Sequence, residues 1–438
     1  MQKSQFLIGA ASSGSGKTTF TLGLLRLLRN RGLKVQPFKC GPDYLDTKHH
    51  AAAAGQESYN LDTFMASTDH VREVYLRHGK EADLCITEGV MGLFDGYDNM
   101  QGSSATIAEL LHLPVILIIN ARSTAYTVAA ILYGFKHFHP RIQIAGAIFN
   151  FVGSEGHYFY LKQACQDAGV EALGYLPKCK DIEIPSRHLG LSIDNQFCFD
   201  EFADRIARQI EETVDIERLL EITTSSFTEE KTPIEKTTCP ATKPLRISVA
   251  RDEAFNFIYP ENIRALEQQG KITYFSPLHD HHLPDSDFIY LPGGYPEFYL
   301  KELCANEDLR YAILSYCQHG GRMLAECGGM MYLCNHIKDT DGNSYPMCGY
   351  LPQTATMENM KLKLGYRIVQ INGQEFRGHE FHYSRIIPDN SPIPTIGKVF
   401  NAKNLEVDTP IYQKGGVTAS YIHFYRADNG KSISDITQ

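Results

Sequence analysis

The sequence predicts an α/β protein with two domains, each built on a parallel β-sheet. Two observations carry this prediction. Short apolar runs alternate with longer amphipathic runs from the first residues onward, and a polar stretch near the middle of the chain interrupts the alternation. Such an alternation is typical of a parallel sheet whose strands are joined by helices. At 438 residues the chain is also long enough for two separate cores.

The first half of the chain supplies one series of elements. The strand QFLIGA (residues 5–10) leads into an amphipathic helical run, TTFTLGLLRLLRNRG (18–32), and the strand LKVQPFK (33–39) follows. Later strands are predicted for DLCITEG, PVILIIN and IAGAIFN, at residues 83–89, 114–120 and 144–150. This rhythm indicates a parallel sheet with crossover helices.

A change of composition separates the two series. Residues 223–243 are rich in Thr, Ser, Pro and charged side chains, which predicts a linker between a domain of residues 1–222 and a second of residues 244–438. The second series begins with LRISVARDEA (245–254). It continues through KITYFSPL, DFIYLPGG and RMLAECGG, at residues 271–278, 287–294 and 322–329.

Charge and composition exclude several classes of function. A formal net charge of -9 argues against a general nucleic-acid binder, because phosphate binding normally leaves a basic footprint on the domain. No run approaches the roughly 20 apolar residues that a membrane span needs, and the N-terminus lacks a secretory signal. We therefore expect no membrane partner and a cytoplasmic location. The 11 cysteines match no zinc or disulfide spacing, so most are expected to be reduced and half-buried.

A phosphate-binding loop is predicted directly after the first strand. Residues 11–18, ASSGSGKT, match the pattern of such loops except that Ala11 stands where the first glycine belongs. Glycines let backbone N–H groups converge on phosphate oxygens, while a lysine reaches the terminal phosphates and a hydroxyl ligates Mg²⁺. The predicted nucleotide-binding residues of the loop are Ser13, Gly14, Ser15, Gly16, Lys17, Thr18 and Thr19.

Carboxylates follow two other strands of the predicted sheet. Glu88 ends DLCITE, and Asp43 follows LKVQPFKC, with Asp46 and Asp95 further along their loops. The carboxyl ends of parallel strands lie at one edge of a sheet, on the same side as the phosphate loop. We therefore predict that Asp43 and Glu88 share a Mg²⁺ ion with Thr18.

Four segments in this half carry a family resemblance. SSGSGKTT, FKCGPDYLD, TEGVMGLFDG and IPSRHLGL, in this order, resemble the synthetase domain of cobyrinate a,c-diamide synthases, a P-loop NTPase domain itself similar to dethiobiotin synthetase. The resemblance implies that ATP and Mg²⁺ phosphorylate a substrate carboxylate, whose phosphate ammonia then displaces. It also implies that Asn150 and Pro177 lie near the adenine ring. It puts the tetrapyrrole carboxylate near side chains that could equally be structural loop residues, namely Asp43, Tyr44, Leu45, Asp95, Arg187 and His188.

Cys327 is the candidate nucleophile of the second half. In RMLAECGGMMYL (residues 322–333) a strand-like run ends at this cysteine, and two glycines precede an apolar, helical segment. A sharp strand-to-helix turn of this kind exposes a nucleophile and needs small neighbours. The helix N-terminus and a nearby imidazole would favour the thiolate, the form that attacks an amide carbonyl.

A base and an oxyanion site are needed beside this cysteine. The half resembles class I glutamine amidotransferases, which have a flavodoxin-like fold, and His423 lies where those enzymes carry the catalytic histidine. They commonly place a glutamate two residues later, whereas this chain has Tyr425, as in the cobyrinate branch with its Cys-His pair. Gly293 and Gly294 in YLPGGYPE are the predicted oxyanion donors, although a Gly-Gly pair after a strand can be only a turn.

The role of RGHEFHYS, residues 377–384, stays open between two interpretations. The resemblance implies that His379, Glu380 and His382 hold the active loops or guard ammonia transfer. The alternative is an edge strand with alternating polar residues.

The predicted function is glutamine-dependent amidation of the a and c carboxylates of cobyrinate, with ATP, L-glutamine and a tetrapyrrole as partners and a homodimer as the assembly. A nickel sirohydrochlorin could replace the corrin as substrate. Cobyric acid synthase is disfavoured because it shows a Gln-Asn-containing segment where this chain has FKCGPDYLD. From another class, the first domain could be a switch ATPase with a non-catalytic second domain. The elbow cysteine and His423 argue against that alternative.

Overall fold

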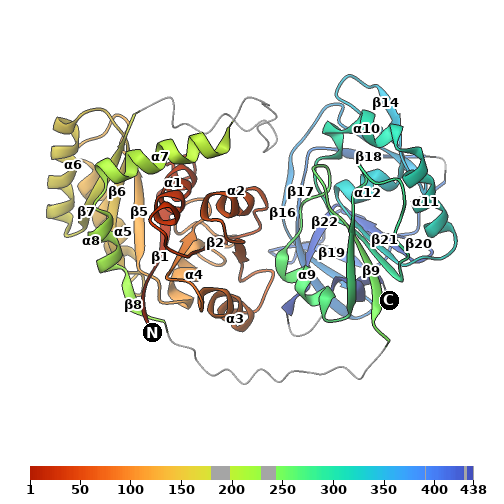
Figure 1. Cartoon of the computed structure of the whole chain (residues 1–438), viewed down its shortest axis with the longest axis horizontal. Coiled ribbons are helices and arrows are strands. Elements are labelled where there is room, and N and C mark those ends of the chain that lie inside the picture. Colours follow the sequence, from red (N-terminus) through yellow and green to blue (C-terminus); the bar gives the residue numbers. More distant parts are fainter. Residues whose placement is uncertain (179–197, 228–242, 390, 429–431, 438) are drawn as a thin grey trace. The chain divides into compact units, whose positions relative to one another are not determined.

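The chain forms two compact units, shown in Figure 1. The computed structural model describes residues 1–178, 198–227, 243–389, 391–428 and 432–437. Unit 1 comprises Met1–Thr63 and Ser67–Thr232, and unit 2 comprises Phe64–Ala66 and Pro233–Gln438. Neither contains a described helix with the length and apolar character that a bilayer crossing requires.

Unit 1 is a parallel sheet with one antiparallel addition and crossover helices. The sheet order is β3-β2-β4-β1-β5-β6-β7, and β8 pairs with β1. The strands are β1 (Gln2–Ala10), β2 (Val35–Cys40), β3 (Tyr59–Leu61), β4 (Leu84–Glu88), β5 (Val115–Asn120), β6 (Ile144–Val152), β7 (Glu171–Pro177) and β8 (Thr224–Ser226). The helices are α1 (Lys17–Asn30), α2 (Leu45–Ala54), α3 (Thr68–Gly79), α4 (Ser104–Leu110), α5 (Val128–Phe138), α6 (Glu155–Ala168), α7 (Phe199–Thr213) and α8 (Ile216–Ile222).

The register of the central strands creates the first site. Ile8 of β1 pairs with Glu88 of β4, and Glu88 pairs in turn with Lys39 of β2, so these residues lie side by side near the carboxyl ends of their strands. The strand β1 is buried at every position after its first residue, as expected for a parallel strand between two helix layers. Every strand predicted for this half is confirmed.

The predicted linker begins too early. Thr224–Ser226 forms β8, which pairs antiparallel with Gln2–Ser4 of β1, and Phe227 is buried. The polar composition of this segment hides a strand because its hydroxyl groups bond to polar side chains of β1, for example Thr223 to Ser4 at 2.7 Å. Unit 1 therefore extends to at least Phe227, and residues 228–242 of the predicted linker lie outside the described residues.

Unit 2 has a main parallel sheet in the order β10-β9-β11-β12-β21-β20, of which only β20 is antiparallel. Counted along the chain, the first five strands have the order 2-1-3-4-5, which is the flavodoxin-like order. The strands are β9 (Leu245–Ala250), β10 (Gly270–Phe275), β11 (Phe288–Leu291), β12 (Met323–Glu326), β20 (Tyr412–Lys414) and β21 (Val417–Ser420). The helices are α9 (Pro260–Glu267), α10 (Leu300–Ala305), α11 (Glu307–Gln318) and α12 (Gly328–Leu333), with 3-10 turns at Pro296–Phe298 and Ile433–Thr437.

Two smaller sheets complete unit 2, with strand orders β14-β13-β15-β18 and β19-β16-β17-β22. Their strands are β13 (Cys334–Lys338), β14 (Ser344–Pro346), β15 (Leu351–Thr356), β16 (Lys363–Ile371), β17 (Gln374–His382), β18 (Arg385–Pro388), β19 (Lys398–Asn401) and β22 (Ile422–Tyr425). The segment RGHEFHYS supplies most of β17, which lies between β16 and β22. The edge-strand interpretation of this segment is therefore wrong.

Candidate functional sites in the two units

The phosphate loop joins β1 to α1 and depends on two glycines with positive φ. Gly14 has φ 75° and Gly16 has φ 96°, a region in which a side chain would be strained. A Cβ atom on Gly16 would also lie 1.9 Å from the side-chain nitrogen of Asn150. That nitrogen donates a hydrogen bond of 3.0 Å to the carbonyl of Ser15. Asn150 on β6 therefore stabilises the conformation of the phosphate loop.

Lys17 lies over the same loop. Its ammonium donates to the carbonyl oxygens of Met91 and Ser12, at 2.5 and 3.4 Å. Burial, and then repulsion from the Lys39 ammonium, lower the pKa of Lys17. The lysine is thus oriented by backbone carbonyls and is positioned to exchange these contacts for phosphate oxygens.

A buried cluster of charges lies beside Thr18. The Thr18 hydroxyl donates to Glu88 Oε1 at 2.7 Å, and Lys39 Nζ lies 2.8 Å from the same oxygen and 2.7 Å from Asp46 Oδ2. His50 Nε2 is 2.7 Å from the other Glu88 oxygen. Burial alone would raise the pKa of Glu88, but the Lys39 ammonium and the hydrogen bond with His50 lower it to about 2. Glu88 is therefore ionised at neutral pH although it is fully buried.

This cluster has the oxygen donors that a magnesium ion prefers. Thr18 and Glu88 are in contact, and the second carboxylate beside Thr18 is Asp46, whose Oδ2 is 3.5 Å from the hydroxyl. That these residues share a Mg²⁺ ion stays a prediction. Asp43 Oδ1 instead accepts the backbone N–H groups of Leu45 and Asp46, at 2.9 and 2.8 Å, at the start of α2. No described group of three or more His, Cys, Asp or Glu side chains could hold a metal. A Mg²⁺ ion here would take most of its ligands from phosphate and water.

The other predicted substrate residues have different surroundings. Tyr44 is buried and Leu45 is half-buried at the start of α2. Asp95 is exposed, and its Oδ2 accepts the backbone N–H of Gly92 at 2.9 Å, which shapes its own loop. Arg187 and His188 lie outside the described residues.

In unit 2, Cys327 lies in a strained turn between β12 and α12. Its φ of 46° and ψ of −108° are unusual for a residue with a side chain, and its N–H donates to the Ser420 carbonyl at 2.7 Å. Both following glycines are required by space, because a Cβ on Gly328 would be 2.8 Å from Pro296 and one on Gly329 2.3 Å from the Leu291 carbonyl. The predicted sharp turn is therefore confirmed.

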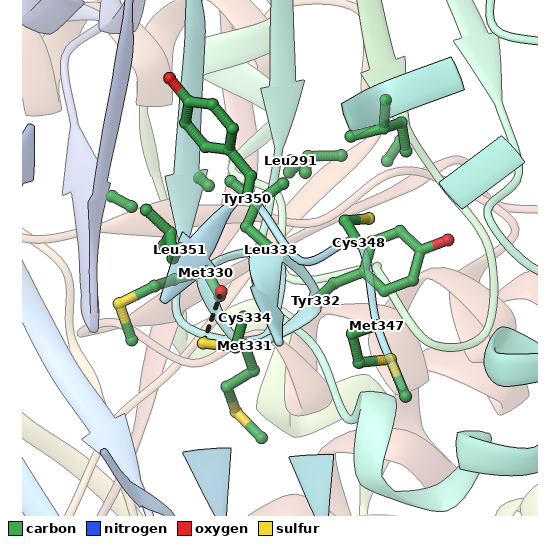
Figure 2. Close-up of a cluster of buried hydrophobic side chains, with 14 of the residues drawn as sticks. Leu291, Met330, Met331, Tyr332, Leu333, Cys334, Met347, Cys348, Tyr350 and Leu351 are labelled. Atoms are coloured by element: carbon green, nitrogen blue, oxygen red, sulfur yellow. Dashed lines mark hydrogen bonds between the residues drawn. The ribbon is translucent and has the colours of Figure 1, made fainter. Parts of the chain in front are cut away.

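The helix after the turn is anchored in the core. Figure 2 shows its apolar side chains packed with residues of the following loop and strands, and a hydrogen bond of 3.4 Å from Cys334 Sγ to the Met330 carbonyl. Because this packing leaves α12 little freedom, the backbone of the turn is rigidly held. The buried cluster includes Leu291, Met330, Met331, Tyr332, Leu333, Cys334, Met347, Cys348, Tyr350 and Leu351.

The Cys327 thiol itself is protonated in this state. Only 4% of the residue is exposed, and Sγ lies 3.9 Å from the carbonyl oxygen of Phe381. Burial raises the pKa of Cys327 far above its usual value, and the carboxyl group of Glu297 raises it further. The backbone N–H of Gly328 at the helix N-terminus lowers the pKa of Cys327, as expected, but desolvation outweighs this effect. The thiol needs a base.

His423 is brought to the same point from β22. A Cβ placed on Gly293 would lie 2.2 Å from His423 Cε1 and 3.3 Å from Cys327 Cβ, so the imidazole and the cysteine both flank this glycine. His423 is fully buried and its ring stacks on that of His379, with centroids 4.9 Å apart. Burial, and then the neighbouring His379, lower the pKa of His423 well below its usual range. The imidazole is neutral and able to accept a proton.

The strand β17 contributes a buried polar network beside this pair. Glu380 accepts hydrogen bonds from Arg367 Nε at 2.7 Å and Thr409 Oγ1 at 3.0 Å, and it lies 2.8 Å from His382 Nε2. The His382 ring stacks on Tyr421, with centroids 3.6 Å apart. Because Glu380 is paired with Arg367 and His382, this network holds strand β17 in place beside Cys327.

Sequence reasoning missed two groups in these sites. Lys39 and Glu326 are buried charged residues within strands, and both lie inside segments that were recognised for other residues. A charged side chain inside an otherwise apolar strand was the available signal, since such residues are rarely buried without a partner.

Comparison with known proteins identifies the families that the two halves of the chain match and the enzymes that the whole chain resembles. Residues 6–191 match the family model of the CobQ/CobB/MinD/ParA nucleotide binding domain, and residues 246–430 match that of the CobB/CobQ-like glutamine amidotransferase domain. The chain is similar to a cobyrinate a,c-diamide synthase of Salmonella typhimurium, at 40% identity over 98% of this chain and 96% of the relative. It is also similar to enzymes with the same name from Dehalococcoides mccartyi, at 39% identity over 97% and 96%, and Listeria innocua, at 38% over 96% and 96%.

Proposed function

Because the chain belongs to the family of cobyrinate a,c-diamide synthases, we propose that it converts the a and c carboxylates of cobyrinate into amides in cobalamin biosynthesis, using ATP and glutamine. One observation carries the proposal beyond family membership: a single chain combines a phosphate loop beside an ionised Glu88 with an elbow cysteine beside a buried neutral histidine. The first arrangement suits activation of a carboxylate and the second suits hydrolysis of an amide.

Unit 1 activates the acid. A carboxylate is a poor electrophile at neutral pH, and transfer of the γ-phosphoryl group of ATP to one of its oxygens creates an acyl phosphate with a good leaving group. The loop residues Ser13 to Thr19 hold the phosphates through backbone N–H groups, and Lys17 neutralises their charge. Thr18 and Glu88 would help to hold a Mg²⁺ ion, which would supply positive charge that neutralises the phosphates. Lys39 pairs with Glu88 and Asp46 and lowers the pKa of Glu88.

Unit 2 supplies ammonia from glutamine. The Cys327 sulfur attacks the side-chain carbonyl carbon while His423 takes the thiol proton, and backbone N–H groups at Gly293 and Gly294 donate hydrogen bonds to the oxyanion. His423 then returns the proton to the nitrogen as the C–N bond breaks, which releases ammonia and leaves a γ-glutamyl thioester. Water hydrolyses the thioester to glutamate. The ammonia displaces phosphate from the acyl phosphate and forms the amide.

The amidation is tested with purified full-length chain, ATP, Mg²⁺, glutamine and cobyrinate, with amides counted by mass spectrometry. We expect two added amides and release of glutamate and phosphate. Transfer of ¹⁸O from a labelled carboxylate to phosphate tests the acyl phosphate. Cys327→Ser should abolish the use of glutamine and preserve amidation with added ammonia. A chain that adds no amide with either nitrogen source, although it folds and binds ATP, would refute the proposed function.

The metal ligands are tested by two matched variants. Asp46 lies beside Thr18, whereas the Asp43 carboxylate accepts backbone N–H groups at the start of α2, so Asp46→Asn should raise the Mg²⁺ concentration required for half-maximal activity more than Asp43→Asn does. The opposite order would restore the original prediction, in which Asp43 is the ligand.

The alternative substrate is tested in the same assay. Nickel sirohydrochlorin carries similar peripheral carboxylates, and faster amidation of this compound than of cobyrinate would reassign the substrate. ATP hydrolysis by a wild type that shows neither glutaminase activity nor amidation would favour the switch-ATPase alternative.

We also propose that the chain forms a homodimer, and a cytoplasmic location stays a prediction. Large apolar side chains on two helices of unit 1 are exposed, among them Tyr133, Phe138 and Phe159. Exposed patches of this kind often mark protein interfaces. Light scattering should therefore give twice the chain mass, and Phe138→Glu should shift the protein toward monomer. A monomeric wild type would refute the dimer.

A further inference from the structure

The catalytic histidine of unit 2 has no carboxylate at the position two residues later on its own strand. Tyr425 stands there, and its ring packs edge-on against Tyr259, with centroids 5.2 Å apart. An imidazole that acts as a base needs one nitrogen oriented toward the nucleophile and benefits from a negative charge at the other. A carboxylate that lies beside the second imidazole nitrogen must therefore come from another strand.

Glu326 comes from such a strand. It is the last residue of β12, directly before Cys327, and it is fully buried. Its Oε2 lies 4.0 Å from His423 Nδ1. Its Oε1 accepts the backbone N–H of Phe424 at 3.0 Å, so the carboxyl group is fastened to the strand that carries the histidine.

Strand β11 also contacts the Glu326 carboxyl group. The Tyr290 hydroxyl on β11 donates to Glu326 Oε2 at 2.7 Å. Tyr290 is also fully buried, which keeps water away from the contact. The Glu326 carboxyl group is thus held in place by β11 and β22 and lies on the Nδ1 edge of His423.

We propose that Glu326 is the positioning residue of the glutaminase site: it holds the Nδ1 edge of His423 and stabilises the imidazolium that forms when Cys327 gives up its proton. The inference rests on the proposed glutaminase function. It deepens that function, because a residue from the nucleophile's own strand replaces the carboxylate that the histidine strand lacks.

The charges around His423 favour Glu326 over the other nearby carboxylate. Glu380 already has Arg367 and His382 as partners, so it gains little from a further positive charge. The donors to Glu326 are a hydroxyl and a backbone N–H, which are neutral. Glu380 raises the pKa of His423, but Glu326 is the carboxyl group whose oxygen lies 4.0 Å from His423 Nδ1. The titratable side chains that face this pair are Cys327 beside it, Tyr290 on β11, Tyr259 before α9, and His379, Glu380 and His382 on β17.

The pKa of Glu326 should be visible in the pH dependence of glutaminase activity. Burial raises the pKa of Glu326 to about 8, while the hydrogen bond from Tyr290 opposes this rise. The ionised carboxylate therefore increases as the pH rises toward 8. If this form supports His423, the glutaminase kcat/KM of the wild type should have a rising limb that depends on Glu326 and on Tyr290.

The test compares two variants of the full chain. Glu326→Gln keeps the size and an acceptor oxygen for the Phe424 N–H but removes the charge. We expect glutaminase kcat/KM to fall about 10–100-fold, mainly in kcat, and the rising limb near pH 8 to disappear. Amidation with added ammonia should be unchanged. Tyr290→Phe removes only the donor to Glu326, so the limb should move to higher pH and activity should recover there.

A second readout does not depend on turnover. The rate at which iodoacetamide alkylates Cys327, followed by peptide mass spectrometry from pH 6 to pH 10, should lose its Glu326-dependent limb in Glu326→Gln. Ammonia-dependent amidation shows whether the Glu326→Gln variant folds. If it does not fold, the pH shift of the rising limb in Tyr290→Phe still tests whether Glu326 supports His423. A Glu326→Gln profile parallel to wild type, with kcat within threefold, overturns the inference and leaves Glu326 as a structural residue.

The two proposals fail in different ways. A wild type without glutaminase activity refutes the proposed function. A wild type with glutaminase activity whose pH profile ignores Glu326 refutes only the inference about the positioning residue.

Discussion

Replacing Gly293 by alanine tests the geometry of the glutaminase site most directly. Its Cβ would lie 2.2 Å from His423 Cε1 and 2.9 Å from His423 Nδ1, whereas ordinary contact begins at 3.4 Å. The imidazole must therefore move by about 3.4 − 2.2 = 1.2 Å, or the loop must move by a similar distance. Gly293 is absent from the residues with positive φ, so the backbone itself accepts alanine and keeps its N–H group.

The size of the effect follows from this displacement. The stacked His379 ring and full burial leave His423 no open space to enter. A misplacement of about 1 Å commonly costs about 100-fold in rate, which corresponds to about 2.7 kcal/mol. We therefore expect glutaminase kcat/KM to fall at least about 100-fold in Gly293→Ala, while amidation with added ammonia stays at the wild-type rate.

The assay measures glutamate release and, separately, amidation with added ammonium chloride. Gly134→Ala is the matched control, because a Cβ at that glycine meets nothing within 4 Å and its φ is not positive. The control should keep both activities. A folded Gly293→Ala protein that releases glutamate within threefold of the wild-type rate would show that His423 is not the base, or that the glycine does not separate it from Cys327.

Three further predictions concern the buried charges. Thr18→Ala removes a ligand of the proposed magnesium site, so the apparent affinity for Mg²⁺ and ATP should fall at least about 10-fold while glutaminase activity persists; unchanged ATP binding in a titration would contradict the proposed site. Lys39→Met leaves two buried carboxylates without their ammonium and should lower the free energy of unfolding in urea by about 3–5 kcal/mol. Lys34→Met, at an exposed lysine, should change it little, and equal effects of the two variants would argue against the cluster. Burial raises the pKa of Glu326 from 4.5 to about 8, so the folded chain keeps this proton where the unfolded chain loses it. The stabilisation is complete below about pH 4.5 and is lost as the pH rises toward 8. Denaturation from pH 5 to 8 should therefore show wild type losing stability relative to Glu326→Gln by at most about 1.4 kcal/mol per pH unit, and parallel curves would contradict the raised pKa.

Local patterns were sufficient for the parts of the molecule whose chemistry is contiguous in the chain. In the phosphate loop, Gly14 and Gly16 adopt positive φ angles, and in the turn, Cys327 does so before two glycines. Because these conformations depend on residues close in the sequence, both features could be predicted from the sequence. The same holds for the parallel strands, because their apolar runs are recognisable without knowledge of their partners.

Contacts between distant strands could not be predicted in the same way. The second carboxylate beside Thr18 is that of Asp46, whereas the Asp43 carboxylate accepts backbone N–H groups at the start of α2. The polar segment at Thr224–Ser226 became a strand because β1 offered both ladder hydrogen bonds and polar side chains. The contacts of Asp46 with Thr18 and of Thr223 with Ser4 join residues far apart in the sequence, and no local pattern reveals them.

The sequence by itself determined the two α/β domains, the phosphate loop, the elbow cysteine and the family. Only the tertiary structure decided which charges meet: Lys39 with Glu88 and Asp46, and Glu326 with His423. The physical reason is that backbone conformation is set by neighbouring residues. The protonation state of a buried group, by contrast, is set by desolvation and by whichever charges the strand register places within a few ångströms.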